Sequence, residues 1–281
     1  LTGFYVYEFG DTGLTTDLHK GSYGTTPELT QPGCPDPPVV QPSLADTPGG
    51  FYNSRLNGRN FAREEGFGAS LRIDQDIGFA DLVSISAFRR SKALYHTDSD
   101  YSPLDYYNAD LGAIDRQLTQ EFQIKSKSAS RLSWILGAYY LRSNEGYDPA
   151  VVYGDILNFA AAPGTVQKIY SRQKVNSLSV YGQATLPLGD TTNATVGLRY
   201  THDKVAGHGF QQLVIPGVGT IPGGASYDGS KTFQRLTWKG ALDHHFSDDV
   251  MAYASISRGY KAGTYNTLPL TTDPAKPETV D

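Results

Sequence analysis

The chain has 281 residues, a formal net charge of -5 and a pI near 5.7, so its charge does not favour nucleic acid or any other polyanion as a partner. Its mean hydropathy is -0.38, and the longest apolar run, from Trp134 to Leu141, is far too short for a membrane-spanning helix. A membrane crossing by this chain would therefore have to use β-strands.

The residue counts narrow the class further. The chain holds 19 tyrosines, 12 phenylalanines and 30 glycines, which suit the aromatic girdles and Gly-rich turns of an outer-membrane barrel and equally a secreted β-protein. Cys34 is the sole cysteine, which excludes an intrachain disulfide and a zinc site built on cysteines. Because the chain starts at Leu1 without a signal peptide and stops at Asp281 without a closing strand, we expect it to be a fragment.

The chain opens with an aromatic-rich segment, Leu1 to Gly10, that reads as the late part of a strand. The connection from Asp11 to Asn60 follows. It contains Pro35, Pro37 and Pro38, so it does not belong in the interior of a sheet. A connection of this length is unusual in a compact domain and ordinary on the outer side of a large barrel.

Two hairpins are predicted next from four segments, of which the first three alternate apolar and polar residues. The segments are Gly66–Asp74, Asp81–Tyr95, Arg116–Lys127 and Leu132–Ser143. In the second segment we expect Val83, Ile85 and Ala87 to form the apolar face. The third segment has a row of charged and amide side chains on one face, which suits a wet lumen better than a dry core. Residues Trp134 to Leu141 are apolar on both faces, so their register is left open.

The clearest unit is the hairpin from Val175 to Lys204, which reads as two strands of roughly ten residues joined by the turn Leu188–Thr191. Its apolar face is predicted to hold Leu178, Val180, Ala184, Leu186, Ala194, Val196, Leu198 and Tyr200. A tilted membrane-spanning strand needs about nine to eleven residues. A soluble sandwich makes the same alternation, so alternation alone does not identify the solvent.

The final pair, Thr232–Phe246 and Val250–Gly263, completes a repeated plan. Short turns are predicted near residues 77, 129, 189 and 248, and they alternate with long loops predicted over His96–Asp115, Asn144–Lys174 and Val205–Lys231. A further loop begins at Thr264, and the next strand is expected from Pro277. About nine strands with open ends are predicted, and a larger closed barrel is their natural completion in lipid.

Three phrases in this order carry a family resemblance. They are GLRYTHD from Gly197, YASISRGYKAG from Tyr253 and KPETVD from Lys276. Over most of Asn60–Asp281 the chain resembles the barrel of a TonB-dependent outer-membrane receptor. The resemblance implies an all-β fold, a transmembrane antiparallel β-barrel of which residues 1–281 form about nine of roughly 22 strands. The plug domain and the C-terminal strands of such a receptor are not found in the chain.

The resemblance also implies a function and a location. A receptor of this family lies in the outer membrane of a Gram-negative bacterium, in contact with outer-membrane lipid. It binds a scarce nutrient such as a ferric siderophore, cobalamin or an oligosaccharide, and imports it with energy from the TonB complex, which acts through the plug. A passive porin-like channel and a soluble β-rich binding or adhesion protein are the alternatives.

Ligand binding is expected on the outer loops, because binding residues tend to lie on loops that a rigid scaffold holds. The candidates are Tyr101, Tyr106, Tyr107, Tyr153 and His208. Arg72, Arg199 and Lys239 fall on polar faces and are expected to be solvated lumen residues, some within reach of a plug.

No catalytic residue, cofactor or metal site is predicted. Gly217 and Gly219 suggest a dinucleotide loop, but Pro222 replaces its third glycine. Asp98 and Asp100 suggest the start of a calcium loop, but the later positions do not match. The sequence also lacks the HExxH and G-x-S-x-G patterns of metalloproteases and serine hydrolases.

Overall fold

The computed structural model describes residues 2–10, 60–99, 105–127, 130–158, 161–267 and 279–280, the first and last of these ranges as backbone alone. The predicted long connection from Asp11 to Asn60 lies outside the described residues, apart from Asn60 itself. Within the described ranges, no helix combines the length and apolarity that a membrane crossing needs.

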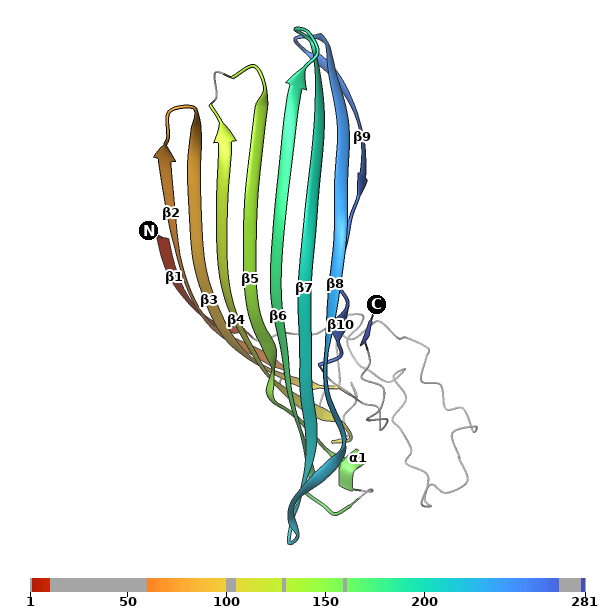
Figure 1. Ribbon diagram of the computed structural model, residues 1–281. Coiled ribbons are helices and arrows are strands. Elements are labelled where there is room, and N and C mark those ends of the chain that lie inside the picture. The colour runs from red at the N-terminus through yellow and green to blue at the C-terminus, as the bar shows by residue number, and fades with distance from the viewer. Residues whose placement is uncertain are drawn as a thin grey trace, which may run out of the picture.

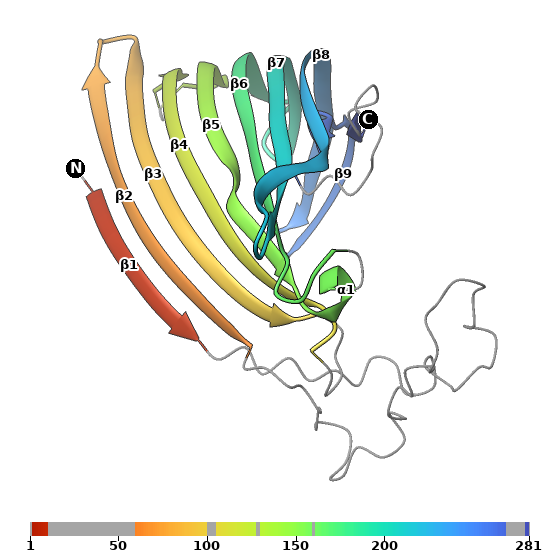
Figure 2. The same cartoon turned by 90° about the horizontal axis from the view of Figure 1, so that it is seen from below.

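One antiparallel sheet of nine strands forms the molecule, and each strand pairs with its neighbours in sequence (Figure 1). Its strands are β1 (Thr2–Gly10), β2 (Phe61–Asp76), β3 (Ala80–Asp98), β4 (Asn108–Ser126), β5 (Ser133–Tyr153), β6 (Val166–Pro187), β7 (Thr192–Ile215), β8 (Gly219–Ser247) and β9 (Val250–Arg258). Seen from below, the sheet is an open arc whose ends are β1 and β9 (Figure 2). The sheet is not closed, which agrees with the predicted partial barrel.

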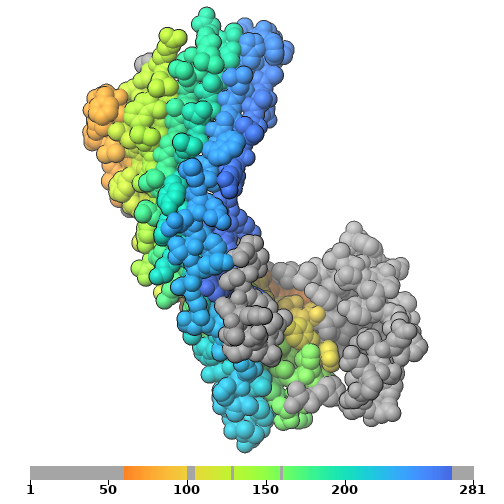
Figure 3. All heavy atoms as spheres, turned by 45° about the vertical axis from the view of Figure 1, so that its right-hand side comes forward, coloured from red at the N-terminus to blue at the C-terminus, as the bar shows by residue number. Residues whose placement is uncertain are grey.

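Two small elements accompany the sheet. Helix α1 (Asp155–Asn158) lies in the connection between β5 and β6, and β10 (Thr264–Tyr265) pairs with β11 (Thr279–Val280). The space-filling view shows a tall wall that bends along its length (Figure 3). Such a wall has two large faces, and the fold depends on how apolar and polar side chains are distributed between them.

The predicted turns are confirmed, whereas the predicted strand lengths are wrong. The chain turns between β2 and β3, β4 and β5, β6 and β7, and β8 and β9, near the expected positions. However, the strands β2 to β8 have 16 to 29 residues, whereas the segments predicted for them have about 9 to 15. Most of the predicted loop Val205–Lys231 is strand, with its turn at residues 216–218, and β5 and β6 take up much of the predicted loop Asn144–Lys174. β3 and β4 likewise extend into the predicted loop His96–Asp115.

The register divides the sheet into an outer and an inner face. On the outer face, one row of directly paired residues reads Ile73, Ser84, Phe122, Ala138, Val180, Tyr200 and Leu236 from β2 to β8. Its neighbouring rows add Phe67, Leu118, Leu178, Val196 and Leu198, which are 47%, 48%, 55%, 64% and 60% exposed. We call this apolar part of the outer face the belt. No described element covers these side chains, so their exposure requires an apolar solvent.

The polar residues inside the belt satisfy one another. Ser86 Oγ lies 2.5 Å from Gln120 Oε1, and Gln120 Nε2 donates to Ser84 Oγ at 3.1 Å. Such pairing lowers the cost of placing hydroxyl and amide groups among apolar side chains. The belt is therefore compatible with hydrocarbon even where serine and glutamine interrupt it.

Beyond the belt, the strands continue toward the connections at 99–107, 154–165 and 216–218, and here the polarity reverses. We call this part the extension. Its inner face holds two buried clusters, Ala150 with Val152 and Ile169, and Val205 with Tyr227 and Tyr265. Leu157 of α1 and Tyr265 of β10 pack on these clusters, which identifies this face as the inner one. Its outer face carries exposed polar residues such as Lys174, Lys204 and Asp228, together with Leu94 and the stacked rings of Tyr170 and Phe210.

The face predicted for β3 is wrong. Val83 pairs with Gln123, and Ile85 pairs with Glu121, so these two apolar residues lie on the inner face with polar partners. Leu82 and Phe88 point outward instead and are 40% and 39% exposed. The register of Trp134–Leu141, which sequence left open, places the even-numbered residues outward, because Leu136 pairs with Ile124 and Tyr140 with Gln120.

Candidate functional site

The inner face at the level of the belt carries a polar cluster built from four strands. The Tyr181 hydroxyl on β6 lies 2.5 Å from Glu121 Oε1 on β4. The side chain reaches across β5 because Gly137 lies between the two strands, and a Cβ there would meet the Tyr181 ring. The Arg199 guanidinium lies 5.7 Å from the Tyr181 ring and 5.8 Å from the Tyr139 ring, within cation–π range. Arg199 thus lies on the inner face, as predicted.

The other two cations predicted for this face also lie there. Arg72 pairs with Asp74, two residues along the same strand, at 2.7 Å. Lys239 pairs in register with Gly197 and Ser257 and is exposed. The inner face of the belt therefore presents both charges and hydroxyls, which suits contact with water or with a polar segment of protein.

A cavity of about 590 Å³ opens on the inner face of the extension. Its lining combines carboxylates, aromatic rings and amides, namely Glu64, Tyr95, Asp115, Glu145, Tyr147 and Gln173. The segment Thr264–Thr267 forms another part of its wall. A cavity of this size, apolar in part and lined by a few polar groups, has the character of a small-molecule site.

Gln173 fixes the wall of this cavity. Its Nε2 donates to Glu145 at 2.7 Å, while its Oε1 accepts from the Thr264 hydroxyl at 2.7 Å and from the Tyr265 backbone N–H at 2.8 Å. The two bonds that Oε1 accepts hold the segment after β9 against β6, and the bond that Nε2 donates links β6 to β5. This segment is anchored again by Tyr260, whose hydroxyl donates to Asp203 at 3.0 Å. Burial and the bond to Asp203 raise the pKa of Tyr260 to about 12.

Close packing explains the glycines that surround this segment. The ring of Tyr265 lies over Gly207, where a Cβ would clash with it, and the ring of Tyr227 lies over Gly209. These glycines suggested a loop in the sequence, yet in the structure they are strand positions that let aromatic rings approach the backbone. The glycines therefore marked a special position in the sequence, but they led to the prediction of a loop where the structure has a strand.

The predicted ligand residues are spread over both faces. Tyr101 lies outside the described residues. Tyr106 is 39% exposed just before β4, and Tyr107 packs on the buried cluster around Ile169. His208 lies on the outer face, where it is 3.0 Å from Asp228 and its ring is tilted against Phe210.

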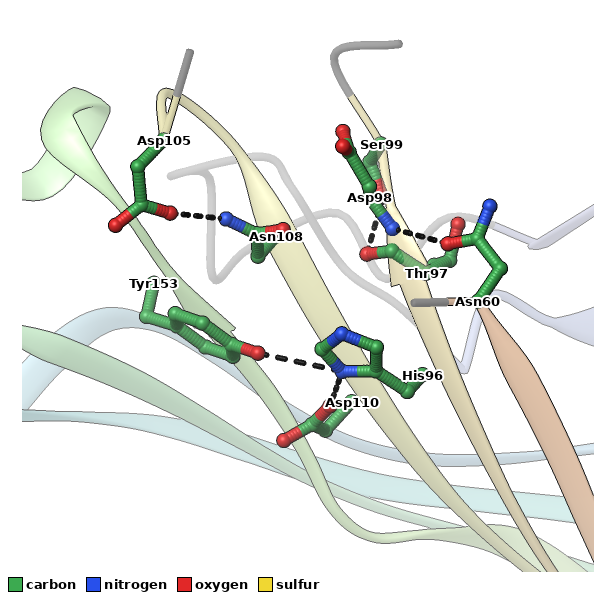
Figure 4. Close-up of polar contacts among 9 residues, drawn as sticks. All are labelled: Asn60, His96, Thr97, Asp98, Ser99, Asp105, Asn108, Asp110 and Tyr153. Atoms are coloured by element: carbon green, nitrogen blue, oxygen red, sulfur yellow. Dashed lines mark hydrogen bonds and ion pairs between the residues drawn. The ribbon is translucent and has the colours of Figure 1, made fainter. Parts of the chain in front are cut away.

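Tyr153 lies on the outer face in a cluster near the ends of β3, β4 and β5 (Figure 4). His96 Nδ1 is 2.6 Å from Asp110 Oδ1 and 3.3 Å from the Tyr153 hydroxyl. The His96 ring stacks on Phe61 at 5.3 Å between centroids. The structure therefore brings Tyr153 together with His96 and Asp110, but places it apart from the cavity.

Of the two aspartates that resemble the start of a calcium loop, Asp98 ends β3 next to this cluster, and Asp100 lies outside the described residues. Asp98 is buried, and its backbone N–H donates to Asn60 Oδ1 at 2.8 Å, whereas Asp105 accepts from Asn108 Nδ2 at 2.5 Å. Asp98 and Asp105 are thus each engaged with an asparagine (Figure 4). In the part of the chain that the structure describes, no three His, Cys, Asp or Glu side chains are grouped to hold a metal ion.

Sequence reasoning missed the residues that line the cavity. Glu64, Asp115 and Glu145 were assigned to connections or strand ends, so no common face was expected for them. The sequence property that could have found them is the alternation of inward and outward positions along a strand. If the predicted strands β2, β4 and β5 had been extended beyond the belt, this alternation would have placed all three acids on the inner face.

Comparison with known proteins agrees with this architecture. Residues 3–281 match the family described as TonB dependent receptor-like, beta-barrel. Among solved structures, the fold is similar to that of the ferric yersiniabactin uptake receptor FyuA from Yersinia pestis, with a TM-score of 0.62 and 18% sequence identity. The match covers 78% of this chain and 32% of the FyuA chain, so this chain spans about a third of the length of that receptor.

Proposed function

Since the chain belongs to the family of TonB-dependent receptors by its match over residues 3–281, we propose that it is part of an outer-membrane receptor that imports a scarce nutrient by active transport. The observation that carries this proposal is the belt, whose exposed apolar side chains face away from every described element. A belt about as tall as the hydrocarbon core, with polar residues on the inner face, is what an outer-membrane barrel presents.

Closure of the barrel belongs to the same proposal. Within the described residues, β1 and β9 are the two ends of the sheet and each has one paired edge. Unpaired backbone N–H and C=O groups in hydrocarbon cost several kcal/mol each. We propose that further strands close this sheet and that a plug domain fills its lumen, in contact with the polar cluster around Arg199.

The orientation follows from the two ends of the sheet. Outer-membrane barrels have short turns on the periplasmic side and longer loops on the extracellular side. The short turns near residues 77, 129, 189 and 248 then face the periplasm, and the extension with its cavity faces the exterior. The cavity on the inner face is accordingly our candidate for nutrient capture, together with Tyr106 and Tyr107 just before β4.

The nutrient itself belongs to the classes that such receptors carry, namely ferric siderophores, cobalamin and oligosaccharides. The solved relative FyuA takes up a ferric chelate, which puts chelated iron first among the ligands to test. Carboxylates, tyrosines and amides in the cavity provide hydrogen-bond partners and aromatic surface for a bulky polar ligand.

Uptake measurements test the proposal. Cells carrying the receptor are offered labelled ferric siderophores, cobalamin and oligosaccharides, with and without a functional TonB complex. We expect uptake of one class that requires both the receptor and TonB. Uptake that persists without TonB, together with steady ion conductance of the purified protein in planar bilayers, would identify a passive channel and overturn the proposal.

A further inference from the structure

A continuous stripe of cations crosses the outer face just beyond the belt. It consists of one residue from each of five adjacent strands, β3 to β7, namely Arg90, Arg116, Arg142, Lys174 and Lys204. All five residues are exposed. The strands that carry the stripe lie side by side in the sheet (Figure 1).

The register shows that the five cations are neighbours. Arg90 pairs directly with Arg116. Arg116 pairs with Asn144, two residues from Arg142, and Asn144 pairs with Lys174. Lys174 pairs with Ala206, two residues from Lys204. Diagonal neighbours on one face lie about 7–8 Å apart, which is within reach of long side chains.

The stripe follows the edge of the belt. Two residues from Arg90, Arg116 and Arg142 on the belt side lie Phe88, Leu118 and Tyr140, which are large outward residues of the belt. Beyond the stripe, Leu94 on β3 and Ile114 on β4 also lie on the outer face. On β6 and β7, Asn176 and His202 separate the lysines from Leu178 and Tyr200. The edge therefore steps along the sheet, as the tilt of strands in a barrel requires.

Within the described residues, no acid lies directly opposite a member of the stripe. The residues directly opposite its members are Phe67, Asn144, Leu118, Asn176, Ala206 and Thr232, or another member. Of the nearby acids on this outer face, Asp110 and Asp148 make ion pairs with His96 and Arg172, and Glu65 lies opposite Lys92 and diagonally from Arg90. Like charges directly opposite each other on paired strands destabilise a sheet, as Arg90 and Arg116 do here. An anion bound between these two arginines would turn their repulsion into a stabilising interaction.

We propose that the stripe binds the phosphate groups of anionic lipid in the outer leaflet. The inference rests on the proposed outer-membrane location. Its position at the boundary between hydrocarbon and water is where lipid headgroups lie, and arginine guanidinium groups match phosphate oxygens in bidentate geometry. Asn144 and Asn176, which lie between the cations, add amide donors to the same surface. The stripe is cationic although the chain has a net charge of -5, which distinguishes this patch from the rest of the surface.

The opposite end of the sheet provides the contrast. Near the short turns, the outer-face positions hold Ser126, Trp134, Leu186, Thr192, His244 and Phe246, with no lysine or arginine among them. Within the described residues, a row of outward cations across adjacent strands thus borders the belt on the side of the long connections, whereas on the short-turn side Lys127 and Arg131 lie in the connection between β4 and β5. Lipid phosphates of one leaflet, and not of both, are the expected partners.

The test is lipid preference of the protein purified from outer membranes. Neutral phosphatidylcholine nanodiscs are compared with nanodiscs that also hold lipid A, a glycolipid with two phosphates. We expect the wild-type protein to retain lipid A, and the variant Arg90→Gln, Arg116→Gln, Arg142→Gln to retain it about a hundredfold less strongly. That figure follows from a loss of roughly fivefold per cation at a charged membrane surface.

Two further variants make the result specific. The charge-conserving variant Arg90→Lys, Arg116→Lys, Arg142→Lys should keep most of the preference. The variant Lys125→Gln, Arg235→Gln, Lys239→Gln removes three cations from the inner face and should keep all of it. Equal lipid A retention by the wild type and the outer-face glutamine variant would overturn the proposal, and so would equal loss in the inner-face variant.

Thermal unfolding gives a second measurement, in which the effect of the glutamine substitutions on the Tm should differ between lipid A and neutral lipid. Lipid A should raise the Tm of the wild type, because a ligand that binds the folded state stabilises it. In neutral lipid the glutamine variant should unfold at the same temperature as the wild type or higher, since the repulsion between Arg90 and Arg116 is gone. Inorganic phosphate at matched phosphate concentration should not raise the Tm. If it does so as much as lipid A, the site is an anion site and not a lipid site. Failure of the wild type to enter any nanodisc would instead refute the membrane location.

Discussion

The two halves of the same strands, the belt and the extension, have opposite polarity. On β7, the outward residues Val196 and Leu198 of the belt are 64% and 60% exposed, while the inward residue Val205, further along the same strand, is 2% exposed. From residue 201 to 211 the inward residues are buried and the outward ones are not, in strict alternation. In the belt the apolar side chains lie on the outer face, whereas in the extension they lie on the inner face, as in a soluble protein. The two halves of the sheet therefore suit two different solvents. The boundary lies where the apolar residues of a strand change from outward to inward positions.

The comparison also separates two sources of stability. In the extension, apolar side chains are removed from water by packing, so each one lost leaves a cavity. In the belt, apolar side chains contact hydrocarbon, so truncation is mild and introduction of charge is costly. Substitutions of the same kind should therefore have different effects in the two halves.

The largest effect is expected from truncation in the extension. Ile169 is 1% exposed and belongs to the buried cluster with Ala150 and Val152. Ile169→Ala should lower the local free energy of unfolding of the extension by roughly 2–5 kcal/mol. Hydrogen exchange of β5 and β6 beyond the belt measures it. The control Lys174→Ala, on the exposed outer face, should change exchange little, and equal effects of the two variants would argue against a packed inner core.

A charge placed in the belt should have the next largest effect. Leu198→Arg puts a guanidinium on the outer face near the middle of the belt, which costs about 2–4 kcal/mol in a bilayer. Urea-dependent refolding into vesicles measures the loss.

The matched control for Leu198→Arg is Ser226→Arg, on the same face of the neighbouring strand β8 but in the extension, where it lies opposite Phe210. Its effect should stay within about 0.5 kcal/mol, as for an ordinary surface change. If Leu198→Arg were as harmless as Ser226→Arg, the distinction between belt and extension would fail.

A smaller loss is expected at the anchor of the segment after β9. Tyr260→Phe removes the hydrogen bond to Asp203 and should cost about 1 kcal/mol in the stability of the extension. Protease sensitivity near residue 260 would report it.

The same bond predicts a dependence on pH. The pKa of Tyr260 is raised to about 12, above its ordinary value near 10, so the neutral hydroxyl is favoured in the folded state. Its contribution is complete below pH 10 and is lost as the pH rises through about 12. The difference between wild type and Tyr260→Phe should therefore vanish at high pH. A difference that grows with pH would contradict the assignment.

The smallest expected effect is a gain in stability, from the substitution Tyr227→Phe. The Tyr227 hydroxyl is buried and makes no hydrogen bond to any described residue. Tyr227→Phe keeps the ring over Gly209 and removes the orphaned group, so the extension should become more stable by up to about 1 kcal/mol. Thermal unfolding checks the sign, and a clear loss of stability would show that the hydroxyl has a partner.

The sequence contained much of this fold. The four short turns, the pairing of the strands in each hairpin and the outward faces of β4, β6 and β7 followed from period-two alternation. β3 was misread because Val83 and Ile85 are apolar and Ser84 and Ser86 are polar, opposite to the faces that pairing imposes. The sequence of β3 alone does not show how it pairs with β2 and β4, and this pairing determines which of its residues face outward. The hydrophobicity of β3 alone therefore led to the wrong face.

The extension could not be predicted for a related reason. Alternation fades where polarity reverses, and Gly207 and Gly209 suggest a loop although they make room for the rings of Tyr265 and Tyr227. The cavity depended on this missed half, since Glu64, Asp115 and Glu145 converge on it only when β2, β4 and β5 run on past the belt. The placement of Tyr153 and His208 on the outer face likewise required the register.

Tryptophan fluorescence tests the central claim most directly, since both tryptophans of the chain, Trp134 and Trp238, lie on the outer face of the belt. In vesicles of lipids that carry bromine on their acyl chains, the account predicts strong quenching of both and weak quenching by aqueous acrylamide. Strong quenching by acrylamide with none by the brominated chains would show that the belt meets water, and would contradict the account.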